Sequence, residues 1–91
     1  MIAKEDLNRY HIASGDGESV ATAYVFDSDY TEDEAIALEY EALSKLYGCT
    51  GRGFVNQEFL MEEGKCLDAI TFYENECLRT IYFDITQHFG K

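Results

Sequence analysis

The sequence has no proline and no tryptophan, and none of its apolar runs approaches the roughly 20 residues needed to span a bilayer. Its first residues include Lys4, Glu5 and Asp6 where a secretory signal would have an apolar stretch. These absences argue against a helical membrane anchor and against a signal of that kind. The sequence therefore predicts a cytoplasmic protein.

Cysteine and histidine are scarce. The cysteines Cys49, Cys66 and Cys77 are odd in number and stand 17 and 11 residues apart, which is not the spacing of a disulfide framework. His11 and His88 lie far from them in the sequence, whereas zinc ligands usually cluster at short intervals. We therefore expect reduced cysteines that pack as small apolar residues, and no metal or cofactor.

The common catalytic and ligand-binding motifs are also missing. The stretch 51–53, Gly-Arg-Gly, is too short for a phosphate-binding loop and lacks its lysine. Asp27, Asp29 and Thr31 alternate as calcium ligands do, but Glu32 stands where an EF-hand loop needs glycine. Neither histidine lies in a nucleophile motif. We expect a protein that is not an enzyme and has no catalytic residues.

The chain does contain enough apolar sequence for one core. Of its 91 residues 46% are hydrophobic, and these include six phenylalanines and seven tyrosines. Domains typically hold about 100–150 residues, so a chain of this length cannot fill two cores. Residues 1–91 are therefore expected to form a single acidic domain.

The first half of the sequence predicts a β-hairpin followed by a helix. Residues 7–13 and 20–26 alternate in polarity as strands do, and the glycine-rich stretch 14–18 between them is typical of a turn. Thr31 and Glu34 have the spacing of a capping box at the start of a helix over 31–47.

The second half predicts three strands, over residues 54–61, 66–73 and 77–86, after a loop at 49–53. We expect residues 87–91 to fray. The order β-β-α-β-β-β predicts an α+β domain in which an antiparallel sheet of about five strands carries one helix on one face. The other face would be bare, with several aromatic side chains, and is a candidate surface for a partner or for a homodimer.

The dominant feature of the sequence is negative charge. Eighteen Asp and Glu residues face seven Lys and Arg residues, which gives a net charge of −11. Residues 10–44 contain no Lys or Arg and carry −9 of that total. Charge of this density opposes folding, which favours a functional reason for it. The carboxylates of this segment, which we predict to form the partner-binding surface, are Asp16, Glu18, Asp27, Asp29, Glu32, Asp33, Glu34, Glu39 and Glu41.

Glu39 is the unusual member of this set. At helical spacing it falls inside the apolar arc formed by Ile36, Leu43 and Leu46. One interpretation places Glu39 at the edge of that arc, where its stem packs and its carboxylate reaches water or a tyrosine hydroxyl. The other makes this helix face part of a recognition surface that includes Glu39.

Three functions remain open. The first is an acidic decoy that binds the nucleic-acid-binding surface of a basic partner and does not itself bind nucleic acid. By size, charge and lack of catalytic motifs, the chain is similar in type to phage and plasmid inhibitors that mimic DNA, such as anti-restriction and anti-CRISPR proteins. The second is an immunity, antitoxin-like or adaptor protein that neutralises a basic partner with no nucleic-acid role. The third is a structural domain whose charge serves only solubility.

Overall fold

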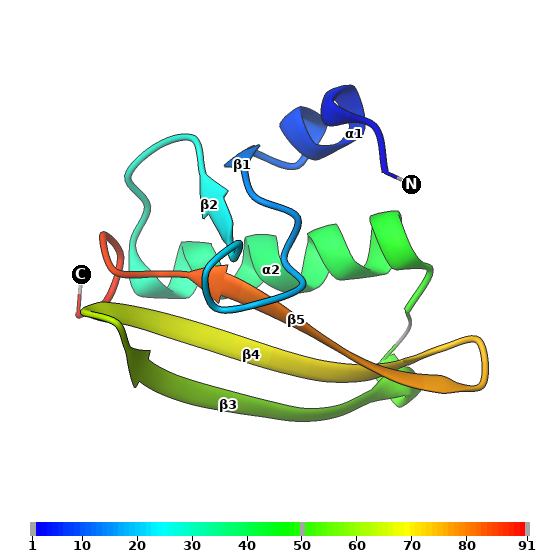
Figure 1. Cartoon of the computed structure of the whole chain (residues 1–91). Helices are drawn as coiled ribbons and strands as arrows, with labels where there is room; N and C mark the ends of the chain where they lie inside the picture. Colours follow the sequence, from blue (N-terminus) through cyan, green and yellow to red (C-terminus); the bar gives the residue numbers. More distant parts are fainter. Residues whose placement is uncertain (1, 50, 91) are drawn as a thin grey trace.

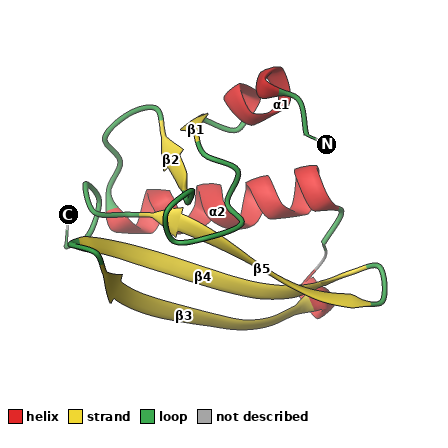
Figure 2. Ribbon diagram, viewed as in Figure 1, coloured by secondary structure: helices red, strands yellow, loops and turns green. Residues whose placement is uncertain are grey.

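The computed structural model describes residues 2–49 and 51–90. Met1, Thr50 in the predicted loop 49–53 and Lys91 in the predicted tail 87–91 lie outside the described residues. A five-stranded sheet carries one long helix across one face, with a short helix on the same side (Figure 1; Figure 2). The elements in chain order are α1 (Lys4–Arg9), β1 (Ile12–Ser14), β2 (Tyr24–Phe26), α2 (Glu32–Tyr47), the 3-10 turn η1 (Gly51–Gly53), β3 (Phe54–Glu62), β4 (Lys65–Glu74) and β5 (Cys77–Asp84). The predicted α+β class is confirmed.

The main helix, α2, begins and ends where the sequence predicts. Thr31 Oγ1 accepts a hydrogen bond from the Glu34 amide at 3.2 Å, and Glu34 Oε1 accepts one from the Thr31 amide at 2.9 Å. This reciprocal pair is the predicted capping box, and it satisfies amides that a helix start leaves without partners. Gly48 ends the helix with a φ of 71°, in the left-handed region that favours glycine.

The strand predicted over residues 7–13 is mostly wrong. Lys4–Arg9 forms α1, and only residues 12 and 13 of the predicted strand belong to β1. Leu7 and Tyr10 stand one helical turn apart and both pack against the core. Acidic residues in the first turn of α1 and a basic residue in its last turn also suit the helix dipole. Helical spacing therefore overrides the short alternation around Ile12.

The strands lie in the order β1-β2-β5-β4-β3. β3, β4 and β5 form an antiparallel meander, and Glu63 and Gly64 in its first turn both have positive φ, as a two-residue hairpin turn requires. β1 and β2 form the predicted antiparallel hairpin. β2 and β5 are parallel, which differs from the wholly antiparallel sheet we expected. The reason is that α2 crosses the sheet after β2, so β2 lies beside a strand that is distant in sequence.

The strand predicted over residues 20–26 is shorter, because only Tyr24–Phe26 forms β2. Before it the chain folds into a compact loop around Asp16. Asp16 Oδ1 accepts hydrogen bonds from the Glu18 amide at 2.9 Å and from the Thr22 hydroxyl at 2.6 Å, while the Asp16 amide donates to the Thr22 carbonyl. Local bonds of this kind compete with strand pairing, so the loop replaces the first half of the strand.

The core lies between α2 and the sheet. Leu43 of α2 is fully buried, as are Ile70 and Phe72 of β4 and Ile81 and Phe83 of β5. The two core residues in each strand stand two positions apart, so all four point to the face of the sheet that carries α2.

The opposite face of the sheet carries fewer aromatic residues than we expected. Tyr73 of β4 and Tyr82 of β5 alternate with the core residues Phe72 and Phe83 and therefore point to that face. Both helices lie on the other side of the sheet (Figure 2). The larger share of the aromatic side chains thus builds the core beneath α2.

The expected fraying of residues 87–91 is wrong for the described part of this tail. The amides of His88 and Phe89 both donate to the Ile85 carbonyl at 2.9 Å. His88 is buried, and its Nδ1 accepts a hydrogen bond from the Tyr30 amide at 3.0 Å. The turn after β5 is therefore fixed against the connection between β2 and α2.

Candidate partner-binding site

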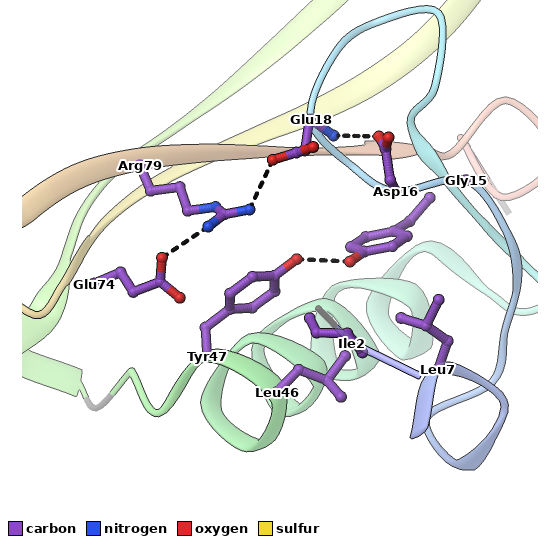
Figure 3. Close-up of a pocket in the computed structure, with 10 residues that line it drawn as sticks. Ile2, Leu7, Gly15, Asp16, Glu18, Leu46, Tyr47, Glu74 and Arg79 are labelled. Carbon is purple, nitrogen blue, oxygen red and sulfur yellow. Dashed lines mark hydrogen bonds and ion pairs between the residues drawn. The ribbon is translucent and has the colours of Figure 1, made fainter. Parts of the chain in front are cut away.

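The nine carboxylates predicted to form one surface lie in separate places. Asp16 and Glu18 line a pocket together with Leu46 and Tyr47, from the C-terminal end of α2 (Figure 3). Five others surround the N-terminal end of α2, and they are Asp27, Asp29, Glu32, Asp33 and Glu34. A helix of 16 residues is about 24 Å long, so these two groups do not form one patch. Glu41 is exposed midway along α2, and Glu39 is buried.

We call the five carboxylates at the N-terminal end of α2 the helix-start cluster, and three of them have structural roles. Asp27 accepts a hydrogen bond from the Tyr30 hydroxyl at 3.0 Å and lies 3.7 Å from His11 Nδ1. Glu32 accepts a hydrogen bond from the Gly90 amide at 2.9 Å. Glu34 belongs to the capping box. These contacts fix the shape of the cluster.

The other two members, Asp29 and Asp33, are exposed and make no hydrogen bond or ion pair with any described side chain. No described Lys or Arg side chain forms an ion pair with the helix-start cluster. Lys45 of α2 stands 12 residues after Asp33, or about 18 Å along the helix axis. The cluster therefore presents carboxylates that no Lys or Arg side chain of residues 2–49 and 51–90 neutralises in an ion pair.

A pocket of about 780 Å³ lies at the other end of α2 (Figure 3). This volume is within the range of small-molecule sites. One wall is apolar and the other is acidic, and the residues concerned are Ile2, Leu7 and Leu46 on the apolar side and Asp16, Glu18 and Glu74 on the acidic side. Hydrogen bonds from Thr22 and from the Glu18 amide lower the pKa of Asp16, so its carboxyl is ionised at neutral pH.

Arg79 of β5 crosses the pocket and holds its acidic wall together. Its Nη1 donates to Glu74 Oε1 at 2.8 Å, and its Nη2 donates to Glu18 Oε1 at 3.0 Å. The guanidinium also lies over the Tyr47 ring, 5.0 Å from the centroid. The described residues that line the pocket include three acidic side chains, Asp16, Glu18 and Glu74, and one cation, Arg79. Their net charge is therefore negative.

The floor of the pocket contains two tyrosines that share a hydrogen bond. The hydroxyls of Tyr24 and Tyr47 lie 2.6 Å apart (Figure 3). Burial raises the pKa of both phenols, so each is neutral and can act as donor or acceptor. This pair joins β2 to the end of α2 and gives the pocket a polar contact on an otherwise aromatic surface.

Glu39 is not part of any surface, so its predicted place in the partner-binding set is wrong. It is fully buried between α2 and β4, next to the carboxyl of Asp68, which is 4% exposed. Both Glu39 carboxyl oxygens and Asp68 Oδ2 lack a hydrogen-bond partner among the described residues. Burial, together with the neighbouring Asp68 carboxyl, raises the pKa of Glu39 to about 10. Glu39 is therefore protonated at neutral pH.

Three residues of these sites, Arg79, Tyr47 and Asp68, are not among the predicted site residues. A signal existed for two of them, because Arg79 shares a strand face with Ile81 and Phe83, and Asp68 interrupts an apolar strand. A charged residue on a buried face calls for a partner. The partner of Arg79 could be identified only from the fold, because Glu18 lies 61 residues away in the sequence.

No protein-family model, no curated protein and no solved structure matches the chain. Within residues 2–49 and 51–90, no three His, Cys, Asp or Glu side chains are placed to hold a metal ion together. No helix in the same ranges is long and apolar enough to cross a membrane.

Proposed function

We propose that this protein is a small, acidic, cytoplasmic inhibitor. It binds the nucleic-acid-binding surface of a basic partner and acts there as a decoy for the nucleic acid. The observation that carries the proposal is the helix-start cluster, where Asp29 and Asp33 are exposed and form no ion pair with any described cation. Proteins that bind nucleic acids present Lys and Arg to phosphates. Carboxylates at a fixed helix end can pair with the same cations.

The helix start also explains why the fold tolerates such charge. Asp33 and Glu34 lie in the first turn of α2, where the helix dipole stabilises negative side chains. The capping box holds Thr31 and Glu34 in one geometry, which fixes the direction of the neighbouring carboxylates. A partner therefore meets preorganised charge and does not need to order a loop.

The pocket favours a second candidate function, the neutralisation of a basic protein that does not bind nucleic acid. A Lys or Arg side chain could lay its aliphatic stem along Leu7 and Leu46 and place its cation beside Glu18. Recognition of this kind needs one projecting basic side chain and no resemblance to a phosphate backbone.

Capture of a partner from nuclease-treated host lysate, followed by kinetics with the purified partner, tests the proposal. The informative variant carries Asp29→Lys and Asp33→Lys, because neither carboxylate makes an internal contact. The matched control carries Glu63→Lys and Glu76→Lys, which change the net charge equally in two exposed turns. We expect the first variant to slow association steeply at low salt, the control to associate like the parent, and duplex DNA or RNA to displace the partner.

Each outcome separates the candidate functions. A partner that nucleic acid does not displace, and that is lost when Glu18 is replaced with Lys, would favour the second candidate. If both double variants bind like the parent, the decoy is wrong, and if Glu18→Lys also binds like the parent, the charge serves solubility. A shift of DNA by the isolated protein near physiological salt would also contradict the decoy, since its net charge of −11 repels phosphate.

A further inference from the structure

β3 is an edge strand, and it differs from the edge on the other side of the sheet. β3 spans nine residues, whereas β1 spans three. Edge strands present unpaired backbone N–H and C=O groups, and proteins usually shield them by shortening or bulging the strand. β3 has one irregularity, between Phe54 and Asn56, and keeps a regular register with β4 from there to Glu62. Residues 56–62 therefore form a regular edge that is open to pairing.

Exposed apolar side chains follow this edge, and two of them, Phe59 and Met61, lie on the side of the sheet that carries α2, because they pair with Asp68 and Cys66 of β4. Val55, Phe59 and Met61 are 54%, 43% and 72% exposed. Phe89, from the turn after β5, stacks on Phe59 with ring centroids 4.9 Å apart. We call these four residues the β3 patch. An exposed apolar patch beside an open strand edge is typical of an interaction surface.

The other side of β3 is acidic. Glu58 and Glu62 are exposed there, and the whole strand contains no Lys or Arg. Lys65 lies directly across from Glu62 in β4, whereas the residue across from Glu58 is Ala69. Glu58 therefore has no cation beside it in the sheet, and a residue of an added strand would be its closest cross-strand neighbour on the open side.

Charge disfavours a second copy of the chain at this edge in the registers that are centred on Glu58 or Leu60. Antiparallel self-pairing centred on Glu58 would place two Glu58 carboxylates directly opposite each other, and like charges in that position are destabilising. Centring on Leu60 would pair Glu58 with Glu62 of the other copy. Each copy also carries a net charge of −11. Charge complementarity points to a basic segment of another protein.

We propose that β3 accepts an extended segment of a partner protein as a sixth strand, and that this segment alternates apolar residues with Lys or Arg. Its backbone pairs with the open edge of residues 56–62, as in other cases of strand addition. Its apolar residues lie on the β3 patch, and a basic residue lies opposite Glu58. This surface is separate from the helix-start cluster, and the proposal does not depend on the decoy function.

Peptide binding to the whole protein tests the proposal. The probe is an acetylated and amidated peptide of the length of β3, nine residues, in which valine alternates with lysine. We expect it to slow hydrogen exchange of β3 amides, measured by NMR. Glu58→Lys should weaken binding by roughly five- to tenfold, as an attractive cross-strand pair becomes a repulsive one. Glu76→Lys, an equal charge change in an exposed turn, should leave the affinity unchanged.

Two further peptides separate strand addition from general attraction to an acidic protein. A valine–glutamate peptide should bind Glu58→Lys better than it binds the parent. The valine–lysine peptide with alternate backbone nitrogens methylated should not bind, because it cannot pair with the edge. Equal affinities for Glu58→Lys and Glu76→Lys, binding of the methylated peptide, protection outside β3 or no binding at all would overturn the proposal. A dimer of the protein with protected β3 amides would also overturn it, in favour of a second copy.

Discussion

Glu39 of α2 and Asp68 of β4 place two carboxyl groups side by side in the interior, and neither finds a basic partner among the described residues. Burial raises the pKa of both groups, and the Asp68 carboxyl adds to the rise at Glu39. At neutral pH the pair therefore keeps at least one proton. A carboxyl pair in this position makes the packing of α2 on the sheet sensitive to pH.

We expect the free energy of unfolding to fall as the pH rises. Glu39 has a pKa of about 10 in the folded chain and an ordinary value of 4.5. The folded state therefore binds more protons than the unfolded state between these values, and stability is lost as the pH rises through that window. One such group contributes a slope of at most about 1.4 kcal/mol per pH unit. Urea unfolding at several pH values between roughly 4 and 9 measures the slope.

The matched variants for this measurement are Glu39→Gln and Glu41→Gln. Glu39→Gln removes the ionisable group from the interior, so its unfolding free energy should fall less with rising pH than that of the parent. Glu41 is exposed on the same helix, and Glu41→Gln should follow the parent. Parallel curves for the parent and Glu39→Gln would show that Glu39 does not bind the proton.

Gly17 has no room for a side chain. A Cβ at this position would lie 2.6 Å from Tyr24 Cε2 and 2.9 Å from Ile81 Cγ2, and its φ is +73°. Gly17→Ala should cost roughly 2–4 kcal/mol, from overpacking and from the left-handed backbone. Gly48 has a similar φ of +71° and nothing near its Cβ position, so Gly48→Ala should cost only roughly 1–2 kcal/mol. Denaturant unfolding that gives equal losses would contradict the clash at Gly17.

The N-cap of α2 and its contact with the core can be compared in one experiment. Thr31→Ala removes the hydroxyl that caps α2 and should cost roughly 0.5–2 kcal/mol. Leu43→Ala truncates a fully buried side chain and should cost roughly 2–5 kcal/mol. Urea midpoints at constant slope measure both losses. A neutral Leu43→Ala would mean that α2 packs by another face.

Arg79 should hold the Asp16 loop against β5. The Tyr82 amide donates to the Gly17 carbonyl at 2.8 Å, next to Glu18, which pairs with Arg79. Arg79→Met keeps the aliphatic stem and removes the ion pairs, so exchange of the Tyr82 amide should become faster. The loss of global stability should stay below about 1 kcal/mol, because the side chain is one-third exposed and screened by solvent. Arg52→Met, in an exposed position, is the control, and unchanged exchange in both variants would contradict this role.

Local features explain which parts of the fold could be predicted. The capping box needs only Thr31 and Glu34, and the first meander turn needs only Glu63 and Gly64, so neighbouring residues were sufficient. The prediction failed over residues 7–13, where two apolar residues fitted both a strand and a helix and packing against the core decided between them. The nine acidic residues are close in sequence, which predicts one surface, but the length of α2 separates them in the fold.

Local sequence patterns were sufficient to predict the α+β class, the limits of α2 and the meander strands, because periodicity, capping and turn chemistry act over a few residues. The contacts between distant segments depend on the packing of the whole fold. This packing set β2 parallel to β5, brought Arg79 between Glu18 and Glu74, and buried Glu39 against Asp68. These outcomes depend on which faces pack together, and a local pattern of polarity does not specify the partner of a face.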